Sequence, residues 1–172
     1  CIRDSNPSNP VIGLRSYGDD AEMVGKMASA EIEGLAEYNV IGCAKHFPGH
    51  GDVATDSHYG LPIVDKSKEE LLNNELKPYQ VAINQGIEMI MSAHILYPQL
   101  DNTTVYSEKT KQQEKLPSTL SHKILTNLLK EEMGFKGVVV TDAMNMAGIA
   151  ATYDEVQAVK LAINAGVDLI CM

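Results

Sequence analysis

The sequence predicts an α/β fold, in which helices cover a parallel sheet. Helix-like and strand-like segments alternate along the chain. The strand-like segments are short apolar runs without alternation, as is typical of strands buried on both faces. Two helix-to-strand junctions, residues 84–90 and 164–170, nearly repeat each other. That repeat indicates a βα unit that is used more than once.

Polar residues that follow the strands narrow this prediction to one kind of α/β fold. Asp4, the stretch 45–58, His94 and Asp142 each come just after a strand-like run. Barrels of eight βα units carry their chemistry at this end of the strands, whereas a doubly wound sheet gathers it at one switch point. Because such barrels need about 200 residues or more, we expect residues 1–172 to be part of a (β/α)8 barrel. The expected part is about the C-terminal half, cut at both ends.

The first half of the chain contains clear start and stop signals. Two aspartates precede a helical pattern that runs from about residue 20 to 38, and the apolar run 40–44 is the first expected strand. Ser67 and Glu70 form a capping-box pattern ahead of the next helix. Pro78 suits the first turn of a further helix, which ends near Gly86 before a strand at 87–92.

The second half continues the alternation after an interruption. Residues 101–117 are polar and are expected to form a surface loop. A helix then begins at Ser121 and ends at Gly134. A strand, a helix and a strand follow at 138–141, 155–164 and 167 onward.

Bulk composition excludes several classes of protein. The net charge of −9, without a cluster of Lys and Arg, argues against binding to nucleic acid. No apolar run approaches the roughly 18 residues of a membrane span. The location of the parent protein stays open between envelope, secreted and cytoplasmic. Cys1, Cys43 and Cys171 have no metal or redox spacing, and we interpret the last two as buried small hydrophobes.

The His-rich stretch after the first strand contains the first group of candidate site residues. Lys45 and His46 are placed to donate hydrogen bonds to substrate hydroxyls, although a strand-end Lys beside a core His is the alternative. His58 has a neutral-range pKa as a residue type and can act as an acid and a base, with Asp56 orienting its ring. An ordinary solvated turn is the alternative for that pair. His50, between two glycines, is expected to brace the loop.

Asp142 ends a buried strand, where an ionised carboxylate is costly unless it has a use. We interpret it as a nucleophile, with a helix N-cap as the alternative. Arg15 could clamp a hydroxyl pair or an anion, or form a surface salt bridge. His94 is expected to be packed rather than catalytic. A metal site is not expected, because the histidines of the loop match no compact zinc motif.

Two motifs carry a family resemblance. Lys-His-Phe-Pro-Gly-His-Gly at 45–51 with Asp-Ser-His at 56–58, together with Val-Thr-Asp-Ala-Met at 140–144, resembles glycoside hydrolase family 3. More narrowly, it is similar to the β-N-acetylglucosaminidase (NagZ-like) branch. The agreement runs from residues 9–13 to 165–168.

The resemblance implies a retaining hydrolase that needs no cofactor and acts on a small carbohydrate substrate, terminal β-N-acetylglucosamine of cell-wall muropeptides or chitin-type fragments. By this resemblance Asp142 is the nucleophile, and His58, paired with Asp56, is the acid/base. The implied substrate-binding residues are Lys45, His46 and Arg15. The missing half of the barrel, which would carry a further substrate-binding Asp, is expected to be needed for a complete site. A β-N-acetylglucosaminide phosphorylase and a non-catalytic sugar-binding fragment remain as alternatives.

Overall fold

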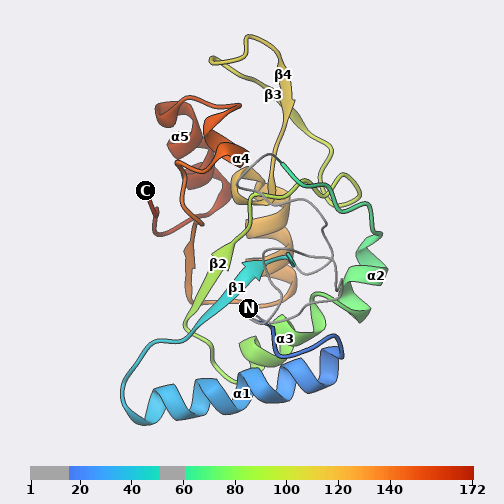
Figure 1. Ribbon diagram of the computed structural model, residues 1–172, viewed down its shortest axis with the longest axis vertical. Coiled ribbons are helices and arrows are strands. Elements are labelled where there is room, and N and C mark those ends of the chain that lie inside the picture. Colours follow the sequence, from blue (N-terminus) through green and yellow to red (C-terminus); the bar gives the residue numbers. More distant parts are fainter. Residues whose placement is uncertain (1–15, 51–60) are drawn as a thin grey trace.

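The structure, a computed structural model, describes residues 16–50 and 61–172 (Figure 1). Its centre is a parallel sheet of three strands in the order β1-β2-β5. The strands are β1 (Cys43–Phe47), β2 (Met89–Ser92) and β5 (Val138–Val140). A parallel bridge between Val140 and Leu169 extends the sheet beyond β5. The predicted α/β fold with parallel strands is thus confirmed, and over the described residues the sheet is open rather than closed into a barrel.

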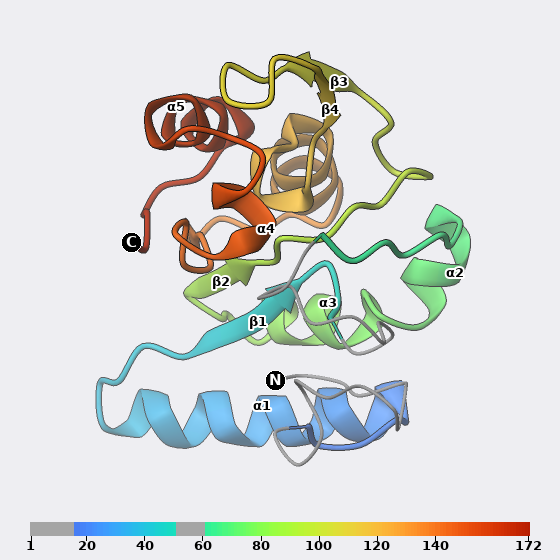
Figure 2. The same ribbon diagram turned by 45° about the horizontal axis from the view of Figure 1, so that its top comes forward.

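Helices surround these strands. Their bounds are α1 (Ala21–Glu37), α2 (Lys68–Asn73), α3 (Lys77–Asn84), the 3-10 turn η2 (Ser118–Leu120), the π-helix η3 (Lys123–Glu132), α4 (Ala147–Ala150) and α5 (Glu155–Ala165). Helices α1 and α3 pack together along one side of the molecule, and α5 lies toward the opposite side (Figure 2). None of the helices in the described ranges is long and apolar enough to cross a membrane.

The start signals in the sequence act as predicted. Asp20 caps α1, because its carboxylate accepts a hydrogen bond of 2.7 Å from the amide of Met23. Ser67 and Glu70 form both hydrogen bonds of a capping box at the start of α2. Pro78 lies in the first turn of α3.

The repeated junctions also have the same geometry. Gly86 after α3 and Gly166 after α5 have positive φ angles of 84° and 106°. The amide that follows each glycine donates to a carbonyl in the last turn of its helix. Glycine adopts this left-handed conformation without the steric cost of a Cβ, so each helix ends sharply and the chain turns into the next strand.

Three predicted elements differ in the structure. The strand expected from residue 167 onward forms only the single parallel bridge between Leu169 and Val140. β1 begins at Cys43 and extends to Phe47, because its pairing with β2 resumes after His46, so Lys45 and His46 belong to the strand and not to the loop. The expected loop at 101–117 contains an antiparallel hairpin, β3 (Thr104–Tyr106) and β4 (Gln113–Lys115). This hairpin is anchored to α5, since the side chain of Gln157 donates a 2.6 Å hydrogen bond to the carbonyl of Tyr106.

The interpretation of the two later cysteines was wrong. Cys43 and Cys171 are both exposed free thiols. Cys43 is in the outermost strand of the open sheet, and Cys171 follows the single bridge at Leu169. Among the described residues, no further strand packs beside either cysteine. Both side chains are therefore exposed, although their neighbours in the sequence are apolar.

Candidate active site

Asp142 lies two residues beyond the end of β5, next to the end of β2. Its amide donates a 3.2 Å hydrogen bond to the carbonyl of Ser92, the last residue of β2. One carboxylate oxygen, Oδ1, accepts a 2.8 Å hydrogen bond from the amide of Ala143. The side chain remains 23% exposed. Asp142 therefore presents a partly exposed carboxylate at the carboxyl end of the sheet.

This geometry removes the alternative interpretation of Asp142 as a helix cap. The next helix, α4, begins at Ala147, and its N-cap position is Met146. The Asp142 carboxylate bonds to the amide that immediately follows it, not to the first turn of α4. The carboxylate therefore does not cap α4.

His46 brings an imidazole to this carboxylate. Its Nε2 lies 3.7 Å from Oδ2 of Asp142, and its side chain is only 6% exposed. The register of β1 against β2 shifts between Lys45 and Phe47, so His46 is the extra residue of a bulge. A bulge re-aims a side chain at the edge of a sheet. Here Phe47 packs edge-on against Tyr79 on α3, while His46 reaches toward Asp142.

The loop after β1 is held from two directions. The hydroxyl of Tyr97 donates to the carbonyl of Gly49. Gly49 has a positive φ of 154°, and a Cβ there would lie 3.0 Å from two side-chain carbons of Glu75, so glycine is favoured at this position. His50 is buried, and its ring lies edge-on to that of His46 with 5.7 Å between the centroids. The loop thus supports the position of the His46 ring.

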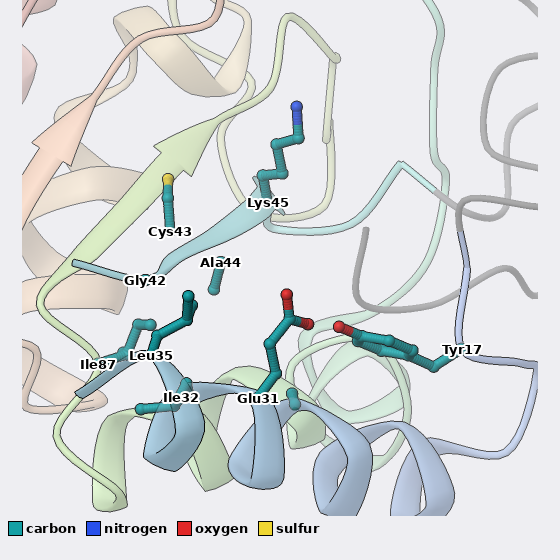
Figure 3. A pocket seen from close by; sticks show the side chains of 10 residues that line it. Tyr17, Glu31, Ile32, Leu35, Gly42, Cys43, Ala44, Lys45 and Ile87 are labelled. Carbon is teal, nitrogen blue, oxygen red and sulfur yellow. The ribbon is translucent and has the colours of Figure 1, made fainter. Parts of the chain in front are cut away.

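Lys45 lies beside a cavity of about 260 Å³ between α1 and β1 (Figure 3). Its side chain leaves the face of β1 that points away from α1, whereas Ala44 points toward the helix. Glu31 and Tyr17 line the opposite wall of the cavity. Lys45 therefore offers an ammonium group on the same strand as His46.

The remaining predicted residues are not placed. Arg15 and the predicted acid/base pair, Asp56 and His58, lie outside the described residues. Within residues 16–50 and 61–172, no group of three or more His, Cys, Asp or Glu side chains is arranged to hold a metal ion.

Sequence reasoning assigned His94 to packing and did not recognise its contact with the site. The His94 ring is 1% exposed, and its Nε2 lies 3.0 Å from the carbonyl oxygen of Ala143, the residue after Asp142. The position just beyond β2 was the available signal. The group that His94 contacts is the backbone carbonyl of Ala143, and every residue type has such a carbonyl, so the sequence does not single it out.

Comparison with known proteins places the chain in context. The glycosyl hydrolase family 3 N-terminal domain matches residues 4–172. β-Hexosaminidase A of Pseudoalteromonas piscicida is 42% identical over 170 residues, which are 98% of this chain and 28% of that protein. The curated relatives it matches are thus covered over less than half of their length.

Solved structures have the same fold over nearly the whole chain. A glycoside hydrolase family 3 β-N-acetylglucosaminidase from Paenibacillus sp. str. FPU-7 is 40% identical, with a TM-score of 0.90 over 99% of this chain and 30% of that one. A β-glucoside phosphorylase is 31% identical, with a TM-score of 0.88 and the same two coverages. The fold thus occurs in a hydrolase and in a phosphorylase.

Proposed function

The chain belongs to glycosyl hydrolase family 3, and we propose that it contributes the nucleophile side of the active site of a retaining exo-β-N-acetylglucosaminidase. The observation that carries this proposal is the partly exposed Asp142 carboxylate at the end of β5, with the imidazole of His46 at 3.7 Å. Relatives at 30–42% identity are β-hexosaminidases, which are glycoside hydrolases.

The proposed reaction is a double displacement. An oxygen of Asp142 forms a bond to the anomeric carbon while the bond from that carbon to the leaving-group oxygen breaks. His58 donates a proton to the leaving oxygen, and Asp56 orients its ring. Water then attacks the anomeric carbon, His58 takes up the water's proton, and the bond to Asp142 breaks. The sugar leaves with retained configuration.

The nucleophile is suited to the first step by its contacts. The amide of Ala143 holds Oδ1, which restricts rotation of the carboxylate. The imidazole of His46 lies beside the carboxylate of Asp142. Together with the ammonium group of Lys45, it can donate hydrogen bonds to substrate hydroxyls or to oxygens on which negative charge develops. We assign Lys45, His46 and Arg15 to substrate binding and His50 to loop support. No cofactor is needed, because each step uses side chains, substrate and water.

We propose that a complete site requires the rest of the barrel. The chain forms an α/β fragment of the family's N-terminal barrel domain, about its C-terminal half. Open edges at β1 and beyond β5 leave backbone groups for further strands. A further substrate-binding Asp would come from those strands. The substrate class is terminal β-N-acetylglucosamine on muropeptides or chitin-type fragments.

A phosphorylase is a second candidate, favoured by the similarity to a β-glucoside phosphorylase. An acid/base histidine is neutral after it gives up its proton, so it repels an incoming phosphate less than a carboxylate would. Phosphate-dependent release of sugar 1-phosphate would identify this activity, and release of free sugar at an unchanged rate with and without phosphate would exclude it.

The proposal is tested with a chromogenic aryl β-N-acetylglucosaminide and the complete protein, meaning this chain with the rest of its barrel. Asp142→Asn should lower turnover by at least about 10³-fold, because the neutral amide cannot form the covalent intermediate. Asp65→Asn, an exposed carboxylate beyond the loop, is the matched control and should retain activity. Full turnover by Asp142→Asn would refute the proposal, and retained sugar binding without any turnover in the unaltered protein would favour the non-catalytic alternative.

A further inference from the structure

His94 occupies a buried polar network at the end of β2. Its Nδ1 lies 2.9 Å from the hydroxyl of Thr119, which also receives a 3.0 Å hydrogen bond from the hydroxyl of Ser92. These three side chains are 0–1% exposed. A buried polar network of this kind is costly unless its members are paired, and it fixes the ring in one orientation.

The other ring nitrogen of His94 faces the nucleophile's own loop. Nε2 lies 3.0 Å from the carbonyl oxygen of Ala143, and a carbonyl oxygen only accepts, so the proton of this bond is on Nε2. The amide of the same residue, Ala143, donates to Oδ1 of Asp142. His94 therefore contacts Ala143, whose amide in turn restrains the carboxylate of Asp142.

The end of β2 contacts this turn at two points. The carbonyl of Ser92 accepts from the amide of Asp142, and two residues later the ring of His94 donates to the carbonyl of Ala143. The carbonyl of Ala143 also accepts a 3.1 Å hydrogen bond from the amide of Met146. Without the ring of His94 the carbonyl keeps the bond from Met146 but loses its anchor to the end of β2, so the backbone at Ala143 is held less firmly and its amide can shift relative to Oδ1. A displacement of about 1 Å at a reacting group is enough to cost a large factor in rate.

We propose that His94 is a positioning residue for Asp142, acting through the backbone of Ala143. This inference rests on the proposed function, because it takes Asp142 to be the nucleophile. His94 does not touch the substrate in this account. Its effect is confined to the rate at which the carboxylate attacks, and it leaves sugar affinity unchanged.

The test measures covalent trapping of the complete protein by a fluorinated N-acetylglucosaminyl fluoride, together with kcat and KM. His94→Leu removes both ring contacts and should slow trapping and lower kcat by about 10- to 100-fold with little change in KM. His94→Gln can still present an amide N–H to the carbonyl of Ala143, and it should recover most of the trapping rate. His94→Asn reaches only toward Thr119 and should remain slow.

Ser118→Ala is the control variant. It shows how far the loss of a buried hydrogen bond near this site changes the trapping rate on its own. Ser118 is fully buried on the same 3-10 turn as Thr119, but its hydroxyl donates to the carbonyl of Ile95. It should lose thermal stability and keep its trapping rate. If His94→Leu fails to fold, the comparison of His94→Gln with His94→Asn decides the same point.

Different outcomes test the role of His94 and the proposed function of Asp142 as nucleophile. Equal trapping rates for the Gln and Asn variants, or a folded Leu variant within about twofold of the unaltered protein, would overturn the role of His94 while leaving Asp142 as nucleophile. Unaltered protein that is not trapped at all, or is trapped at another residue, would overturn the proposed function itself.

Discussion

The imidazole of His46 lies 3.7 Å from the carboxylate of Asp142 although their strands are not neighbours. β2 runs between β1 and β5, so the two side chains meet across its carboxyl end. The bulge at His46 and the bond from the amide of Asp142 to β2 make this approach possible. The relationship connects Asp142, the proposed nucleophile, to the His-rich motif, which precedes it by almost a hundred residues.

Replacement of His46 should affect catalysis more than folding. His46→Leu removes the imidazole beside Oδ2 and a predicted donor to the sugar, so kcat/KM should fall by about 10- to 100-fold in the complete protein. His122→Gln, an exposed histidine at the start of η3, is the matched control and should be unchanged. A kcat/KM within about twofold for His46→Leu would remove His46 from the site.

Gly137 permits the close approach of β5 to β2. A Cβ there would lie 2.2 Å from the carbonyl oxygen of Glu88, so Gly137→Ala must push the two strands apart. We expect the free energy of unfolding to fall by about 3 kcal/mol. Gly34→Ala, in an exposed turn of α1 with no atom within 4 Å of the new Cβ, should be neutral or stabilising by about 0.5–1 kcal/mol. Urea unfolding compares them, and equal stabilities would contradict the close packing at Gly137.

Asp101 should contribute stability that depends on pH. Burial acts to raise its pKa, but hydrogen bonds from Ser121, Thr103 and Lys123 outweigh burial and hold the pKa below its ordinary value of 3.8. The folded state thus favours the charged form. The stabilisation is present above pH 3.8 and is lost as pH falls through the lowered value.

Asp101→Asn should therefore reduce the free energy of unfolding by about 2 kcal/mol near neutral pH. The difference from the unaltered protein should shrink as the medium is made more acidic than pH 3.8. Urea unfolding of both proteins, near neutral pH and below pH 3.8, measures this difference in the free energy of unfolding. A difference that grows on acidification would contradict the assigned direction of the pKa.

The isolated chain should hydrolyse poorly. Residues 1–172 supply Asp142, His46 and Lys45, but the relatives extend well beyond the matched part. We expect the chain alone to show a small fraction of the activity of the complete protein on an aryl β-N-acetylglucosaminide. Activity equal to that of the complete protein would show that the missing barrel half is dispensable.

The sequence predicted those features that depend on local chemistry. Asp20, the capping box at Ser67 and the glycines that end α3 and α5 mark boundaries through their own hydrogen bonds or φ angles. The polar residue after β5 was recognised because a carboxylate in that position is unusual. Such signals act within a few residues and are therefore visible in one sequence.

Features that depend on pairing between distant segments were missed. The extension of β1 through His46 follows from its register against β2. The hairpin at 104–115 pairs a short strand of favourable residue types, Thr104–Tyr106, with the polar segment Gln113–Lys115, whose composition does not predict a strand. The contact of His94 with Ala143 joins a side chain to a backbone carbonyl almost fifty residues away. No pattern within either segment encodes these contacts.

The most direct test of the central claim is identification of the residue that becomes attached to the sugar. The complete protein, inactivated with a fluorinated N-acetylglucosaminyl fluoride and digested, should give one glycosylated peptide, modified at Asp142 when analysed by tandem mass spectrometry. Attachment at any other residue, or turnover by inversion with no adduct, would contradict Asp142 as the nucleophile.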